Sequence, residues 1–392
     1  PSPPAASRSS PGSEVAQPTG EAERVERVST LELFFDLVFV FTITQLTGVL
    51  SDDPTARGLL RVVLMLGVIF YMYGGYAWLT NAVAADRAAR RLLLLGGMAG
   101  FLVLALAIPR AFSEGDIAFG VAYLVIVGIH AGLFTRAAEA HTIRAVIRLA
   151  PFNLVSALLV LAAVAVEGTA AYLFWAAAFA LEWFTPLLSG TGGFRIAPAH
   201  FVERHGLVVI VALGESIVAI GIGAAGLPVD LALASVAVLG LLLAACLWWA
   251  YFGGDDTRAE RALAAVPDDR RGWVALQAFG YWHLLMLLGI IALAAGLKDA
   301  TGHAFDPLDL AHALLLSGGV ALFLAADVLF RRTLDLGPGR VRATAAALAL
   351  ATIPLGLWLS ALLQLTALVL VLAGSLAAEP AVLRPRGRQP RR

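Results

Sequence analysis

The amino-acid sequence predicts an all-α protein, a polytopic bundle of about twelve transmembrane helices. Three observations predict it: the composition, a series of long apolar runs, and an alternation of arginine-rich and arginine-poor loops. Of the 392 residues, 59% are hydrophobic and 14% are charged, and the mean hydropathy is +0.83. Soluble domains carry about 45–50% apolar and about 25% charged residues. A water-soluble fold is therefore excluded, and a net charge of zero argues against nucleic acid as a partner.

The apolar runs have the length that a membrane span requires. A helix needs roughly 20 apolar residues to cross a hydrocarbon layer of about 30 Å. The expected spans, in chain order, are 31–50, 59–80, 91–109, 117–135, 146–166, 170–189, 204–224, 230–252, 273–297, 308–330, 341–357 and 358–376. The last two share one run, in which Ile353-Pro354-Leu355-Gly356 favours a tight turn; one kinked or re-entrant helix is the alternative.

Basic residues assign the expected orientation, because cytoplasmic loops of membrane proteins are enriched in Lys and Arg. With the N-terminus in the cytoplasm, 24 of the 28 basic residues lie on the cytoplasmic side. The other side keeps Arg57, Arg61, Arg110 and Lys298. We therefore expect both termini to be cytoplasmic. The strong preference for arginine over lysine suggests a bacterial genome, and hence the bacterial cytoplasmic membrane.

Two tails flank the apolar part of the chain. Residues 1–28 are rich in Pro, Ser, Glu and Arg and contain no apolar run, so we expect a disordered cytoplasmic tail. Residues 377–392 carry five arginines and are expected to form a basic cytoplasmic tail.

The two halves of the chain resemble each other. An offset of 171 residues pairs Glu32 with Glu203 and Gln45 with Ser216. We interpret 29–190 and 195–376 as two six-helix repeats, and because six is even the repeats would be parallel. Chance similarity between hydrophobic helices is the alternative.

Two motifs carry a family resemblance. The segments STLELFFDLVFVFTITQ (29–45) and HFVERHGLVVIVALGESIVAIG (200–221) resemble the bacterial low temperature requirement A (LtrA) family. The likeness covers roughly residues 25–376. It implies a multi-pass membrane protein linked by name to growth in the cold, and it implies no known reaction, substrate or catalytic residue.

Glu215 is the sharpest candidate for function. It lies eleven residues beyond Arg204, or about 16 Å along a helix, and the same face carries both. An ionisable group at the centre of a span costs at least about 2.5–3.5 kcal/mol, so such groups usually face the bundle interior. We interpret Glu215, with Ser216 beside it, as a proton- or cation-responsive site. A hydrogen-bonded or ion-paired structural glutamate is the alternative.

Glu32 and Asp36 lie four residues apart on one face at the start of the first span. They are expected to bind Arg204 and Arg27 and hold helices together; a cation entry is the alternative. Gln45 is expected to face another helix, because nine residues rotate the side chain by about 180°.

The remaining deep ionisable residues receive structural or weaker functional interpretations. His283 could relay protons near neutral pH, although a satisfied neutral histidine is commoner. Asp327 precedes Arg331 by four residues, which is a helical ion-pair spacing. Asp255-Asp256 and Asp268-Asp269 flank an arginine-bearing loop that we expect to be solvated.

Metal and cofactor sites are not expected. His200-Phe-Val-Glu203-Arg-His205 brings possible ligands together but lacks the HExxH order of zinc peptidases. The expected partners are the lipid bilayer and a small ion or solute, with a homo-oligomer left open.

Three function classes remain. A transporter of ions or solutes fits the repeat and the buried carboxylates. A non-transporting sensor or assembly factor in cold adaptation is the second class. A lipid-modifying membrane enzyme is the third, but we find no nucleophile–base pair or metal cluster, so no catalysis is expected.

Overall fold

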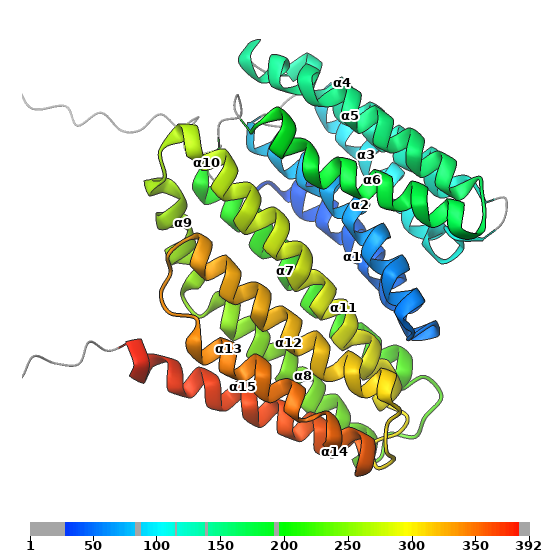
Figure 1. The fold of residues 1–392 in the computed structure, drawn as a ribbon, viewed down its shortest axis with the longest axis vertical. Coiled ribbons are helices and arrows are strands. Elements are labelled where there is room, and N and C mark those ends of the chain that lie inside the picture. The colour runs from blue at the N-terminus through cyan, green and yellow to red at the C-terminus, as the bar shows by residue number, and fades with distance from the viewer. Residues whose placement is uncertain (1–27, 83–87, 114–115, 138–139, 192–195, 384–392) are drawn as a thin grey trace, which may run out of the picture.

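A computed structural model describes residues 28–82, 88–113, 116–137, 140–191 and 196–383, and the helices pack as a single bundle (Figure 1). The expected tail at 1–28 lies outside these residues apart from Val28, as do the last nine residues of the expected tail at 377–392. Within the described residues every regular element is helical, so the all-α prediction is confirmed.

The helices form two groups that follow each other along the chain (Figure 1). The first group contains α1 (Thr30–Asp52), α2 (Ala56–Ala82), α3 (Ala88–Ala107), α4 (Ala118–Ala137), α5 (Ala140–Val164) and α6 (Gly168–Ser189). The second contains α7 (Pro198–Gly223), α8 (Leu231–Phe252), α9 (Asp255–Ala265), α10 (Asp268–Ala275), α11 (Trp282–Ala300), α12 (Leu310–Thr333), α13 (Arg340–Ala351), α14 (Ile353–Trp358) and α15 (Ala361–Leu383). A 3₁₀ turn (Ile108–Arg110) follows α3, and a π-helical segment (Leu276–Tyr281) joins α10 to α11.

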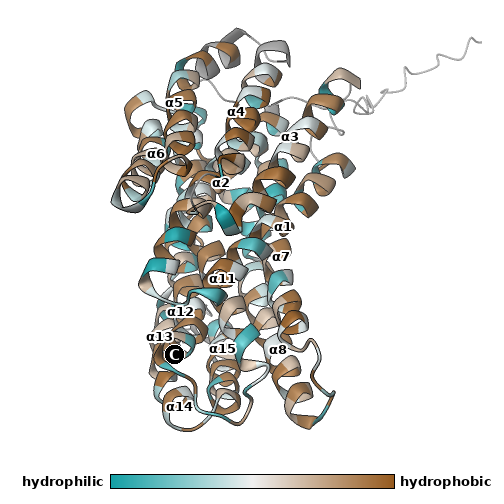
Figure 2. Ribbon diagram, turned by 90° about the vertical axis from the view of Figure 1, so that its right-hand side faces the viewer, coloured by the Kyte–Doolittle hydropathy of each residue, from teal (hydrophilic) through white to brown (hydrophobic). Residues whose placement is uncertain are grey.

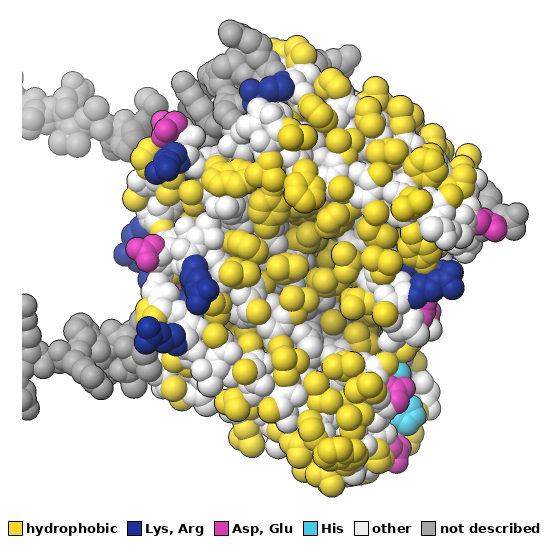
Figure 3. Space-filling model, viewed as in Figure 1, with side chains coloured by type: hydrophobic (Ala, Val, Ile, Leu, Met, Phe, Trp, Pro, Cys, Tyr) yellow, Lys and Arg dark blue, Asp and Glu magenta, His cyan; other side chains and the backbone are white. Residues whose placement is uncertain are grey.

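The protein is a multi-pass membrane protein. Eleven helical segments among the described residues are long and apolar enough to cross a membrane. The one expected span not among these eleven is 117–135. It corresponds to α4, whose apolar part, Ala118–Leu133, is shorter. Figure 2 shows the helices hydrophobic over most of their length, and Figure 3 shows side chains of this kind covering the outer face between charged groups at its two ends. Helix α1 begins and α15 ends at the same end of the bundle, which we call the terminal end (Figure 1).

Side-chain caps mark where α1 and α12 begin. Ser29 and Glu32 form a capping box at α1, in which each side chain satisfies a backbone N–H at the start of the helix. Asp309 caps α12: its carboxylate accepts a hydrogen bond from the backbone N–H of His312 (2.9 Å), and this bond holds the pKa of Asp309 below its usual value. Both caps satisfy donors that a helix cannot satisfy itself.

The last apolar run forms two spans, but the turn is not where the sequence placed it. The helix is interrupted at Thr352 and continues through Pro354 as α14. The chain reverses at Leu359-Ser360, where the backbone N–H groups of Ala361 and Leu362 donate to carbonyls of the α11–α12 loop. Pro354 is tolerated because it occupies the first turn of α14, where no N–H is needed.

Helices α11 and α12 approach each other most closely at Gly289 and Gly319. A Cβ atom added to Gly319 would lie 2.6 Å from the Gly289 carbonyl oxygen and 2.6 Å from the Leu293 amide nitrogen. Backbone cannot move aside as a flexible side chain can. The contact therefore requires glycine at both positions.

Gly319→Ala is expected to lower the free energy of unfolding by about 1–3 kcal/mol, because the added methyl group must separate the two helices. Titration of the detergent-solubilised protein with SDS, followed by circular dichroism, measures this change. The neighbouring variant Gly318→Ala is the matched control, since a Cβ there meets nothing within 4 Å. Equal unfolding curves for the two variants would contradict the close approach.

Candidate functional site

The interface between α1 and α7 contains a fully buried ion pair near the terminal end. Arg204 on α7 donates from one guanidinium nitrogen to Asp36 Oδ2 (2.7 Å) and to the backbone oxygen of Glu32 (2.7 Å). Tyr73 on α2 donates its hydroxyl to the other oxygen of Asp36 (2.8 Å). The guanidinium also lies 5.5 Å from the ring centres of Phe35 and Tyr73. Arg204 and Asp36 are 1% and 2% exposed, so this pair joins the two groups of helices within the protein interior.

Glu32 belongs to the same interface but has a different set of partners. Its Oε2 accepts hydrogen bonds from the backbone N–H and the hydroxyl of Ser29 (2.8 Å each), and its Oε1 lies 3.0 Å from His200 Nε2. Asn81 donates to His200 Nδ1 (3.3 Å), which places the ring proton on Nε2, facing Glu32. Asn81 also exchanges two hydrogen bonds with the backbone of Ala197. These contacts hold the start of α1, the end of α2 and the start of α7 together.

Glu215 occupies a second, separate cluster on the same interface. It is 1% exposed, and Thr44 on α1 donates its hydroxyl to Glu215 Oε2 (2.5 Å). Thr47, one turn farther along α1, is another neighbour of the carboxylate. Glu215 Oε1 has no hydrogen-bond partner in the described part of the chain. Arg204 lies about 16 Å away along α7, so Glu215 is not paired with it.

The other expected site residues are distributed around these clusters. Ser216 is completely buried, and its hydroxyl has no partner among the described residues. Gln45 is half-buried on α1, beside Thr44. His283 lies in the second group of helices, where its Nε2 is 2.9 Å from the Tyr251 hydroxyl and its Nδ1 is 2.9 Å from the Ala278 oxygen. The seven expected residues therefore do not converge on one cavity.

Charge pairing distinguishes Glu215 from most buried acids. Six carboxylate side chains are buried in the described residues: Glu32, Asp36, Glu182, Glu215, Asp255 and Asp327. Four of them contact a basic side chain. Glu215 and Glu182 instead accept hydrogen bonds from hydroxyl groups, those of Tyr123 and Ser156 in the case of Glu182. An unpaired carboxylate in a low-dielectric interior is costly when charged, so these two groups favour bound protons or cations.

Comparison with known proteins identifies the family. Residues 27–377 match the family described as bacterial low temperature requirement A protein (LtrA). The chain belongs to the LtrA family. It is also 28% identical over 325 residues to the uncharacterized protein RA0937 of Rhizobium meliloti (strain 1021), an alignment that covers 78% of this chain and 77% of the relative. No solved structure matches it significantly.

This LtrA-family protein contains a second ionic cluster, which we call the terminal network. It lies at the terminal end of the bundle and joins α9, α12, α13 and α15. Its members are Asp255, Arg258, Asp327, Arg331, Arg342 and Glu379. Arg331 lies 2.5 Å from Asp255 Oδ2 and 2.9 Å from Glu379 Oε1. Arg342 contacts Asp255 (3.0 Å), Asp327 and Glu379 (3.2 Å). Three acids thus face three arginines.

The terminal network corrects two expectations. Asp327 binds Arg342 on the next helix and not Arg331, four residues away on its own helix. Asp255 was expected to be solvated but is 1% exposed, because it begins α9 in contact with Arg331 of α12. The expectation holds for Asp268 and Asp269, which are exposed. The helical spacing alone could not reveal a partner supplied by α13 or α15.

The residues of the His200–His205 segment serve structural contacts. His205 Nδ1 lies 2.8 Å from the Phe201 oxygen of its own helix, whereas His200 faces Glu32 and Asn81. Among the described residues, no group of three or more His, Cys, Asp and Glu side chains could hold a metal ion.

Proposed function

We propose that this LtrA-family protein transports protons or small cations along the α1–α7 interface, with Glu215 as the group that binds and releases the ion. The single observation that carries the proposal is the burial of the Glu215 carboxylate, which accepts a hydrogen bond from the Thr44 hydroxyl and forms no ion pair among the described residues. Such a carboxylate is neutral with a proton bound, or balanced by a cation. It can therefore exchange an ion, whereas a carboxylate locked to arginine cannot do so readily.

Other polar side chains on or beside this interface support this route. Between Glu215 and the terminal end lie the Asp36–Arg204 pair and the Glu32–His200 contact. Toward the opposite end, Lys298 at the end of α11 lies 3.4 Å from Asp52 at the end of α1. The buried hydroxyl of Ser216, next to Glu215, has no partner among the described residues and can accept or donate a hydrogen bond on this route. The proposal includes no catalytic step.

We also propose that the two groups of helices, 29–190 and 195–376, are parallel six-helix repeats. Matching helix contacts support this proposal. In the first group, α1 packs on α3, α3 on α4, α4 on α5, and both α5 and α2 pack on α6. The corresponding pairs in the second group are α7 with α11, α11 with α12, α12 with α13, and both α13 and α8 with α15. In each group, moreover, the last helix carries a glutamate that bonds to the fourth and fifth spans. Glu182 bonds to Tyr123 and Ser156, and Glu379 to Arg331 and Arg342.

The proposed orientation places the terminal end in the bacterial cytoplasm. The arginine distribution along the sequence supports it, and in Figure 3 most of the visible basic side chains gather toward that end. In this orientation Glu215 lies past the midpoint of α7, nearer the side of the membrane that faces away from the cytoplasm.

Glu215→Gln is expected to reduce ion flux at least about tenfold, which corresponds to about 1.4 kcal/mol on the barrier. The amide keeps the size and hydrogen-bonding capacity of the side chain but cannot exchange a proton or balance a cation. The measurement is flux of protons, Na⁺ and K⁺ into proteoliposomes, followed with pH- and ion-sensitive dyes inside the vesicles.

Two variants make this test specific. Glu215→Asp keeps the charge and is expected to retain more flux than Glu215→Gln. Glu182→Gln removes the other buried carboxylate of the described residues that has no basic partner, away from the α1–α7 interface, and is expected to leave flux within about twofold. Size-exclusion profiles confirm that each variant is folded. Wild-type vesicles no more permeable than empty ones would overturn transport, and unchanged flux in Glu215→Gln would overturn the site.

A further inference from the structure

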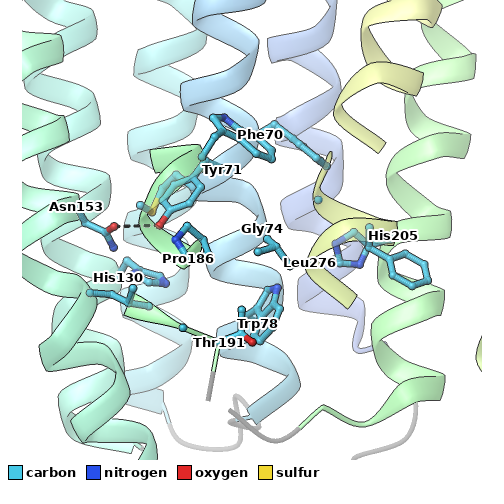
Figure 4. Close-up of a pocket in the computed structure, with 17 residues that line it drawn as sticks. Phe70, Tyr71, Gly74, Trp78, His130, Asn153, Pro186, Thr191, His205 and Leu276 are labelled. Carbon is cyan, nitrogen blue, oxygen red and sulfur yellow. Dashed lines mark hydrogen bonds between the residues drawn. The ribbon is translucent and has the colours of Figure 1, made fainter. Parts of the chain in front are cut away.

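A cavity of about 120 Å³ lies between the two groups of helices, and the proposed ion route does not use it (Figure 4). Its walls come from α2, α4, α5, α6, α7 and the π-helical segment before α11. An apolar cavity of about 150 Å³ is large enough to hold benzene. The volume therefore suits a compact molecule of about one aromatic ring.

The walls of this cavity are aromatic and uncharged. Rings of Tyr71, Trp183 and Phe279 line it, and its 17 lining residues include no Asp, Glu, Lys or Arg. A charged ligand would lose its hydration there without gaining a counter-charge. A planar uncharged ligand would instead gain contact with several ring faces and edges.

A few polar groups from different helices converge on this apolar space. The Tyr71 hydroxyl of α2 donates to Asn153 Oδ1 of α5 (3.3 Å), which leaves the amide hydrogens of Asn153 available. His205 of α7 reaches the cavity from the opposite side, with Nδ1 turned to its own backbone. Apolar walls with a small number of convergent polar groups are the usual form of a small-molecule site. An acyl chain would form no hydrogen bonds with those polar groups.

Two backbone features keep the cavity open. The π-helical segment Leu276–Tyr281 widens the turn that carries Phe279 and Gly280, and such segments are frequent at functional sites. Gly74 of α2 lines the cavity, and a Cβ added there would meet nothing within 4 Å. A side chain could therefore fit at Gly74, but it would occupy the cavity.

One wall of the cavity belongs to α6, on the lipid-facing side of the bundle. Figure 3 shows the apolar outer face hollowed between α6 and α11, and Trp183 and Pro186 of α6 belong to the cavity wall. A molecule dissolved in the membrane can enter by this path, and such molecules are uncharged and largely apolar.

We propose that this cavity is a binding site for a compact, uncharged aromatic molecule that carries one hydroxyl group, whose oxygen accepts a hydrogen bond, and that reaches the site from the membrane. The ring lies among Tyr71, Trp183 and Phe279, and its polar group bonds to the Asn153 amide. Binding is independent of ion transport, so the two proposals can fail separately.

The test measures binding of 4-fluorophenol to the detergent-solubilised protein by ¹⁹F NMR. The wild-type protein is expected to bind it saturably, and Gly74→Leu is expected to weaken binding at least about tenfold, because the new side chain fills the cavity. Gly128→Leu is the matched control: Gly128 is an exposed glycine of α4 where a Cβ also meets nothing, and it does not line the cavity. Equal signals from wild type and Gly74→Leu would overturn the site.

The polar contact has its own test. Asn153→Leu keeps the branched shape and the number of side-chain heavy atoms but removes the amide, and is expected to weaken 4-fluorophenol binding about three- to tenfold. Fluorobenzene, which lacks the hydroxyl, is expected to bind wild type and Asn153→Leu equally. Displacement of 4-fluorophenol by dodecane at equimolar concentration would identify an acyl chain as the occupant and overturn the proposal.

Discussion

Replacing Arg204 by methionine is expected to lower the free energy of unfolding by about 3–5 kcal/mol, because the change leaves a buried carboxylate unpaired. Arg204 is 1% exposed and satisfies both Asp36 and the Glu32 carbonyl. Methionine keeps an unbranched, flexible side chain but supplies neither a charge nor a hydrogen-bond donor. SDS titration followed by circular dichroism measures the loss.

The partner variants separate the ion pair from simple packing. Asp36→Asn in the Arg204→Met background is expected to recover part of the stability, since it removes the orphaned charge. Arg204→Lys is expected to fall between wild type and Arg204→Met, because an ammonium group replaces the charge but not the planar contact with Phe35 and Tyr73. Arg332→Met, at an exposed arginine, is the control and should change stability by no more than about 0.5 kcal/mol. Equal losses at Arg204 and Arg332 would show that the pair does not hold the interface.

The sequence predicted the helical, membrane-spanning architecture because span length is dictated by the thickness of the bilayer, which acts on each segment independently. It also placed Glu32, Asp36 and Arg204 near one end of their helices, since depth follows from residue number at 1.5 Å per residue. The partner of each acid was harder to predict. Tyr73 on α2 and Thr44 on α1 bond to acids that the sequence singled out, yet nothing in their own segments marks them.

The partners of the buried ionisable residues and the position of the last turn depend on how the helices pack against one another, which the sequence alone did not predict. Glu215 and Arg204 share a face of α7 but lie eleven residues apart, so they meet different residues of α1: Arg204 binds Asp36, and Glu215 accepts a hydrogen bond from Thr44. Likewise, Asp327 meets Arg342 because α13 packs on α12, a contact that depends on the whole bundle. The turn before α15 shifted from Ile353–Gly356 to Leu359-Ser360 because the α11–α12 loop offers carbonyl oxygens there.

Replacing Arg331 by methionine is expected to cost a similar amount, about 3–5 kcal/mol, and to release α9 locally. Arg331 is 0% exposed and bonds to Asp255, the first residue of α9, and to Glu379 of α15. Without it, three acids of the terminal network face two arginines. Hydrogen exchange of the 255–275 backbone is therefore expected to rise well above that of α11, since the charge imbalance falls on the start of α9.

A double-variant cycle shows whether the terminal network acts as a unit. The losses from Arg331→Met and Glu379→Gln are expected to combine with a coupling of about 0.5–3 kcal/mol, as residues in direct contact do. Arg261→Met, on the exposed side of α9, is the control and should leave both stability and exchange unchanged within about 0.5 kcal/mol. Strict additivity would show that Arg331 is held mainly by Asp255. Coupling would instead show that α15 and α9 are locked through the same arginine, so that the end of the last helix, past residue 376, helps to hold the α9–α10 segment against the bundle.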